Sequence, residues 1–174
     1  MLPYSRCGLV TVVGVVFSVA LLAWAAPFMP RRIHVSDEVL SLARVEKVKL
    51  VITPFPETVT RAGITPAGVR RDWEKKLRES GLVLVDTKDA MRIHLVMFVS
   101  QDESVPDGIG YCTFVMLEQP VRIERLGKDL FIPTWTGLSN GLRSTQTLAS
   151  GLNKNLEDLL GKYLARSRLA NEHQ

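Results

Sequence analysis

The stretch "AMRIHLVMFVS", residues 90–100, decides the fold because apolar side chains recur in it at every second position. This apolar register consists of Met91, Ile93, Leu95, Met97 and Val99. A period of two is typical of a β-strand, in which successive side chains point to opposite faces of a sheet. The stretch therefore predicts a strand with one buried face, and it places Arg92, His94 and Phe98 on the opposite face.

Other segments predict further strands of the same sheet. Residues 45–52, "VEKVKLVI", also alternate, and Pro54 ends the pattern because proline cannot donate to a strand ladder. The remaining strands are predicted at 82–86, 111–126 and 130–137, with polar turns at 101–110 and 127–129. Successive strands joined by short turns pair antiparallel. We therefore expect a mostly antiparallel sheet of about five strands.

Two amphipathic helices accompany these strands. In residues 65–81, Thr65 and Pro66 suit the N-cap and the first helical position, and Val69, Trp73 and Leu77 share one face. A second apolar stripe at helical spacing runs through residues 144–169. The order strand, helix, four strands, helix predicts an α+β two-layer sandwich over residues 45–169, with both helices on one face. Residues 170–174 are expected to form a disordered tail.

The N-terminal segment predicts export or membrane anchoring. Residues 8–29 carry no charge, and as a hydrophobic helix they would span about 33 Å, enough for a bilayer core of about 30 Å. Ala23 and Ala25 form a small-x-small site, so residues 1–29 are either a signal peptide cleaved after Ala25 or a transmembrane anchor. Residues 30–44 read as a polar tether with room for one turn of helix. We expect a periplasmic domain or a single-pass protein with its domain outside the cytoplasm. An uncleaved span with the domain in the cytosol stays open, because Arg6 lies before the span and other arginines follow it.

Composition narrows the class of protein further. The 174 residues carry a net charge of +4, alternating in sign without a basic block, so we expect no nucleic-acid binding. Two cysteines, Cys7 and Cys112, cannot form a disulfide framework, which for an exported domain favours a bacterial envelope. Gly108 and Gly110 lie beside a predicted hairpin and not at a strand-to-helix turn, where a phosphate-binding loop would lie. We therefore expect no cofactor.

The candidate metal ligands do not form a recognisable set. The three histidines, His34, His94 and His173, belong to different predicted elements, and neither cysteine has a partner at ligand spacing. Acidic residues gather in the loop at 101–110, but their spacing departs from a calcium-binding loop, which needs ligands at alternate positions. We expect no metal site.

One motif suggests an enzyme. "GLSNG", residues 137–141, matches the G-x-S-x-G nucleophile elbow and follows a predicted strand just before a predicted helix. Ser139 would be the nucleophile, with Asp158 and His173 as the downstream partners. The simpler interpretation is a polar loop before a helix, so a small serine hydrolase is kept as an alternative function.

The order of elements resembles small envelope domains of bacteria. The segments "GIGYCTFVMLEQPV" and "IPTWTGLSNG", followed by an amphipathic helix, are similar in style to the N-terminal domain of the translocation protein TolB and to the curli-secretion lipoprotein CsgG. The resemblance covers residues 45–169 and implies an exported α+β domain. It assigns no functional residue.

These features predict a non-enzymatic envelope protein whose domain binds another envelope protein or associates with itself. Two surfaces could serve for this: an exposed sheet edge that accepts an added strand, or the sheet face that the helices leave uncovered. If residues 8–29 are not cleaved, they would also hold the chain in a membrane. The residues expected to bind a partner are Arg92, His94, Phe98 and Trp135, the last as a possible peptide or sugar platform. A small-ligand carrier is a further alternative.

Overall fold

The computed structural model describes residues 35–173. The predicted signal peptide or anchor and its cleavage site lie outside the described residues. Among residues 35–173, no helix is long and apolar enough to cross a membrane.

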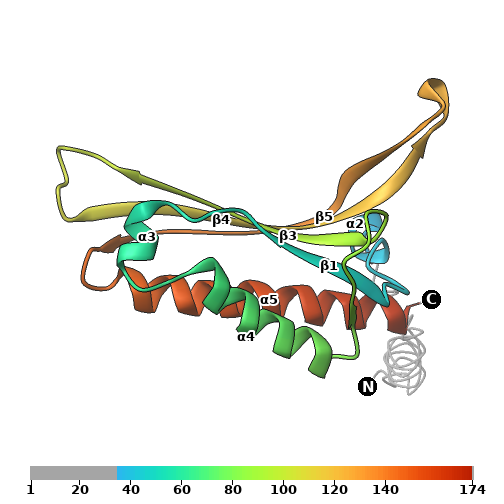
Figure 1. The fold of residues 1–174 in the computed structure, drawn as a ribbon, viewed down its shortest axis with the longest axis horizontal. Coiled ribbons are helices and arrows are strands. Elements are labelled where there is room, and N and C mark those ends of the chain that lie inside the picture. The colour runs from blue at the N-terminus through green and yellow to red at the C-terminus, as the bar shows by residue number, and fades with distance from the viewer. Residues whose placement is uncertain (1–34, 174) are drawn as a thin grey trace, which may run out of the picture. The chain divides into compact units, whose positions relative to one another are not determined.

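The domain is a five-stranded sheet with its two long helices on one face, which confirms the predicted α+β class. The strands lie in the order β2-β1-β3-β4-β5, and Figure 1 shows α4 and α5 together below the sheet. The elements along the chain are α2 (Asp37–Leu40), β1 (Lys47–Ile52), α3 (Glu57–Arg61), α4 (Pro66–Glu79), β2 (Val83–Leu84), β3 (Met91–Gln101), β4 (Gly108–Ile123), a short 3₁₀ helix η1 (Glu124–Leu126), β5 (Lys128–Ser144) and α5 (Leu148–Glu172).

The pairing of the strands is only partly as predicted. β3, β4 and β5 form antiparallel pairs, as expected for strands joined by short turns. β2 and β3 do not pair, however, because β1 lies between them and runs parallel to both. The connection from β1 to β2 passes through α4, and such a helical crossover returns the chain parallel to the strand that it left.

The local signals for α4 correspond to the observed contacts. Thr65 Oγ1 accepts a hydrogen bond from the backbone N–H of Gly68 at 3.1 Å, which caps the first turn. Val69, Trp73 and Leu77 are buried, as their spacing predicts. Gly81 follows the helix with a φ of 93°, a left-handed conformation that glycine adopts without strain.

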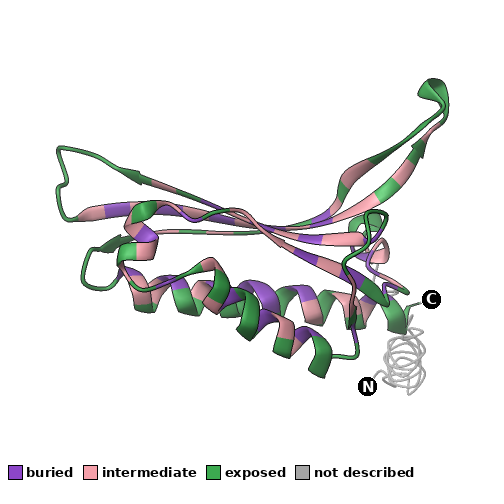
Figure 2. Ribbon diagram, viewed as in Figure 1, coloured by how far each residue is buried: buried purple, intermediate pink, exposed green. Residues whose placement is uncertain are grey.

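The core lies between the sheet and the helices. Ile93, Leu95 and Met97 of β3 are buried, so the alternation of residues 90–100 does distinguish the two faces of the sheet. Leu152, Leu156, Leu159, Leu160 and Tyr163 are among the buried residues of α5. Figure 2 shows buried positions along the strands of the sheet and along the two long helices. Because burying a leucine side chain contributes about 1.5–3 kcal/mol, this layer holds the helices on the sheet.

The folded domain extends beyond the predicted bounds at both ends. Part of the predicted tether forms α2, and Leu42 is fully buried. Two polar side chains of this segment bind β5: Ser41 Oγ donates to the Thr134 carbonyl at 3.1 Å, and Glu38 Oε1 accepts from the Thr136 N–H at 3.0 Å. At the other end, α5 continues to Glu172, and Ala170 within the predicted tail is fully buried.

Candidate interaction surface

The side of the sheet that faces away from α4 and α5 is largely apolar. We call it the open face, and it consists of Val96, Phe98, Cys112, Phe114, Met116, Leu138 and Leu142 from β3, β4 and β5. These residues alternate along each strand with the buried ones, so they point to the opposite side. The exposed fractions are 58% for Phe98, 50% for Leu138 and 63% for Leu142. The sheet therefore leaves large apolar side chains in solvent.

The register of the strands makes the open face continuous. Val96, Phe114 and Leu138 are consecutive partners across β3, β4 and β5. The rings of Phe98 and Phe114 meet edge to face, with centroids 6.0 Å apart and an interplanar angle of 83°. Side chains from three strands thus form one surface.

Polar and charged groups border the open face toward the start of β3. His94 Nδ1 lies 2.9 Å from Glu118 Oε1, and His94 Nε2 lies 3.1 Å from Thr53 Oγ1. Both ring nitrogens of His94 are thus within hydrogen-bond distance of a side-chain oxygen. The Arg92 guanidinium lies 3.9 Å from the centroid of the Phe131 ring, a cation–π contact. These contacts fix the orientation of both basic side chains.

A hollow of about 420 Å³ lies at the opposite end of the open face. Phe98, Cys112 and Asn140 line it together with neighbouring residues of β3, β4 and β5. The Cys112 thiol is half-buried there and free. The hollow gives this end of the surface a recess into which a partner side chain could fit.

Three of the four predicted partner-binding residues lie on this side of the sheet. Arg92, His94 and Phe98 alternate with the buried register of β3, as the sequence predicts. Trp135 does not belong to the surface, because it is only 5% exposed and lies on the helix side. Its ring packs against Tyr163 of α5, with centroids 5.5 Å apart. The prediction of a platform at Trp135 is therefore wrong.

The structure contradicts the nucleophile elbow at Ser139. "GLSNG" lies inside β5, where Ser139 is paired with Thr113 of β4, and the motif requires a tight turn between a strand and a helix. Among the hydrogen bonds of residues 35–173, none joins Ser139 to Asp158 or His173. Instead, His173 Nδ1 is bound to the carbonyl of Leu169 at 3.0 Å.

The two glycines of the motif have a packing role. A Cβ atom on Gly137 would lie 2.7 Å from Cη2 of Trp135, and one on Gly141 would lie 2.6 Å from the Tyr111 hydroxyl oxygen. Glycine within a strand often marks such a close approach. At Gly141 the missing side chain leaves room for the Tyr111 ring, whose hydroxyl accepts a hydrogen bond from Asn155 of α5. The missing side chains at Gly137 and Gly141 therefore leave room for the Trp135 and Tyr111 rings, which contact Tyr163 and Asn155 of α5.

The candidate metal ligands lie apart. No cluster of three or more His, Cys, Asp or Glu side chains that could hold a metal occurs within residues 35–173. His34 lies outside the described residues. In the acidic loop, which contains Asp102, Glu103 and Asp107, the Asp102 carboxylate accepts from the N–H and the hydroxyl of Ser104 at 2.8 and 2.6 Å. These hydrogen bonds lower the pKa of Asp102 below its usual value.

No family model and no curated protein matches the chain. Among solved structures, a minor lipoprotein from Acinetobacter baumannii is 12% identical, covering 71% of this chain and 91% of that chain with a TM-score of 0.34. The uncharacterized lipoprotein B from Nitrosomonas europaea is 13% identical, covering 74% and 83% of the two chains with a TM-score of 0.30. Neither is TolB or CsgG, so the more specific resemblance stays a prediction. At these TM-scores neither likeness supports an inference about function.

Proposed function

We propose that the chain is an exported or membrane-anchored protein of the bacterial envelope, and that its domain binds a protein partner on the open face without catalysing a reaction. The proposal rests on one observation: the helices cover only one of the two sides of the sheet. α4 and α5 cover one side, whereas the other exposes Phe98, Leu138 and Leu142 by half or more. Contiguous exposed apolar surface of this kind marks interaction sites.

The composition of the open face favours a protein as the partner. Aromatic residues dominate the binding energy of protein interfaces, and a polar rim commonly surrounds the apolar centre. Phe98 and Phe114 form the aromatic centre here, while the ordered His94–Glu118 pair supplies polar groups at one border. A partner with an apolar surface would be oriented by hydrogen bonds at this border.

The proposed location rests on the sequence. The uncharged residues 8–29 are long enough to serve as an export signal or as an anchor. No specific observation within residues 35–173 favours the serine hydrolase or the small-ligand carrier.

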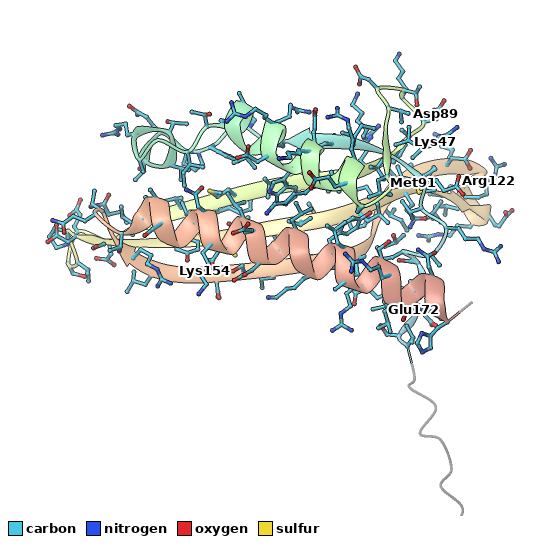
Figure 3. All side chains as sticks on the ribbon, turned by 90° about the horizontal axis from the view of Figure 1, so that it is seen from below. Lys47, Asp89, Met91, Arg122, Lys154 and Glu172 are labelled. Carbon is cyan, nitrogen blue, oxygen red and sulfur yellow. The ribbon has the colours of Figure 1, made fainter. Side chains whose placement is uncertain are left out.

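Site-specific photo-cross-linking in cells that naturally produce the protein tests the proposal. A photoreactive amino acid replaces Phe98 in one variant and Lys154 in the control variant. Lys154 lies on the exposed side of α5 (Figure 3). We expect position 98 to yield a discrete adduct with an envelope protein, identified by mass spectrometry, and position 154 to yield none.

A second change makes the test specific for the surface. Leu138→Ser removes an exposed apolar side chain of the open face without touching position 98. If the partner contacts the open face, this change should weaken the adduct at position 98. Equal adducts from positions 98 and 154, or an adduct insensitive to Leu138→Ser, would contradict the proposal.

A further inference from the structure

The outer edge of β5 is covered only in part. The Thr136 N–H donates to Glu38 and the Thr134 carbonyl accepts from Ser41, so α2 satisfies the edge at these positions. Because backbone groups alternate in direction along a strand, the even-numbered residues that follow also point away from β4. These are Leu138, Asn140 and Leu142. Their outward N–H and C=O groups have no backbone hydrogen-bond partner among residues 35–173, and the only side-chain hydrogen bond to them within this range is the one that Arg143 Nη1 donates to the Leu142 carbonyl at 2.8 Å.

This part of the edge lacks the usual protection against pairing. Native edge strands commonly carry lysine, proline or a bulge that blocks the addition of another strand. Residues 137–142 contain no charged residue and no proline, and the only irregularity in the pairing of β5 with β4 leaves out Thr134, which precedes them. The segment is therefore ready to accept a strand.

We propose that a second copy of this chain pairs with this segment, antiparallel and with Asn140 on the two-fold axis. The free edge is bounded by Thr136, which α2 covers, and by Ser144, where β5 ends. Asn140 lies midway between these limits, so two copies related by this axis overlap over the whole free edge. The symmetry places Asn140 opposite its equivalent, and Leu138 opposite Leu142 of the second copy. Each pair exchanges two backbone hydrogen bonds, and at Leu142 the new bond replaces the one that the carbonyl accepts from its own Arg143.

Side chains and charges are complementary in this register. Leu138 and Leu142 are both exposed on the open face, and each would cover the other across the axis. Arg143 of one copy would lie opposite Gly137 of the other, beside Thr136 and therefore beside Glu38. Neither Glu38 nor Arg143 forms an ion pair within residues 35–173. The association would thus give an ion-pair partner to two opposite charges that are bound only to backbone groups within residues 35–173, Glu38 to the Thr136 N–H and Arg143 to the Leu142 carbonyl.

This inference goes beyond the proposed function because the second copy pairs with the backbone edge of β5, although Leu138 and Leu142 belong to the open face as well. Joining two sheets edge to edge would also bring two open faces side by side. Substituting Phe98 should therefore leave the self-association intact, and blocking the edge should leave the position 98 adduct detectable.

Disulfide trapping of the full chain in detergent tests the register. In a Cys7→Ser, Cys112→Ala background, Asn140→Cys should form a cross-linked dimer on mild oxidation, because partners in a hydrogen-bonded pair lie about 5.5 Å apart between Cα atoms. Val83→Cys is the matched control, since Val83 is 51% exposed on β2 at the opposite edge of the sheet. Leu138→Cys alone should cross-link poorly, whereas a mixture of Leu138→Cys and Leu142→Cys chains should cross-link well.

Charge exchange tests the complementarity. Arg143→Glu or Glu38→Lys alone should reduce the cross-linked fraction at position 140 by up to about fivefold, as expected for one exposed ion pair. The double variant should restore it. Cross-linking at 140 no greater than at 83 would overturn the proposal. Equal yields from Leu138→Cys alone and from the mixture would also do so, as would failure of the double variant to restore the yield.

Discussion

Replacing Gly137 with alanine tests the packing of β5 on α5. The new Cβ atom would lie 2.7 Å from Cη2 of Trp135 and 3.3 Å from Cζ3, whereas carbon atoms in contact are usually 3.5–4.0 Å apart. The ring cannot move away freely, because Trp135 is 5% exposed and packs against Tyr163. Overpacking of this kind costs about 1–3 kcal/mol. We expect the free energy of unfolding to fall by that amount.

The same substitution at Gly161 provides the control. Gly161 lies in α5, and a Cβ atom there would meet nothing within 4 Å. Alanine in a helix interior is about 0.5–1 kcal/mol more stable than glycine, so Gly161→Ala should stabilise the domain. Urea unfolding followed by tryptophan fluorescence measures both variants. A neutral or stabilising Gly137→Ala would refute the argument that the Trp135 ring requires glycine at this position.

Three further predictions concern the core. Leu42→Ala should cost about 2–5 kcal/mol in urea unfolding, because Leu42 is fully buried; a change below about 0.5 kcal/mol would restore the tether interpretation. Tyr111→Phe should cost about 1 kcal/mol by removing the hydrogen bond from Asn155, and an unchanged stability would show that this bond contributes nothing. Burial raises the pKa of the Tyr163 hydroxyl. Above a pH of about 10 the unfolded chain therefore loses the hydroxyl proton while the folded chain keeps it, and the free energy of unfolding falls by up to about 1.4 kcal/mol per pH unit. Tyr163→Phe should therefore make the free energy of unfolding decrease less between pH 9 and 11. An identical pH dependence of stability in the variant and the parent would contradict this effect of burial.

The sequence predicted the elements whose signals are local. The cap at Thr65 and the spacing of Val69, Trp73 and Leu77 lie within one helix, and they correspond to observed contacts. The alternation of residues 90–100 likewise separated the two faces of β3. Such patterns need no knowledge of distant neighbours.

The errors arose where distant contacts decide the structure. Gly137 and Gly141 indicated a loop, but rings of Trp135 and Tyr111 occupy the space that their side chains would take, and β5 continues through them. Leu42 became part of the core only because its segment packs on the sheet and α5. The insertion of β1 between β2 and β3 has no local signal either.

The candidate surface was predicted in part for the same reason. Arg92, His94 and Phe98 followed from the alternation of one strand. Leu138 and Leu142 were missed because the predicted strand ended at residue 137, and their contribution depends on the pairing of β5 with β4. Trp135 was misplaced because its register on the extended strand turns it toward α5.

The central claim is that a partner covers the open face in the cell, and the natural Cys112 thiol is a direct reporter of it. Cys112 lies on the open face and lines its hollow. The measurement is the rate of Cys112 alkylation in intact cells and in the purified folded chain, followed by peptide mass spectrometry. A cysteine introduced by Lys154→Cys on the exposed side of α5 corrects for the access of the reagent to the protein in cells. We expect alkylation of Cys112 to be several-fold slower in cells than in the purified chain, while position 154 reacts at the same rate in both. If the ratio of the alkylation rate in the purified chain to that in cells were the same at positions 112 and 154, the claim that a partner covers the open face would be contradicted.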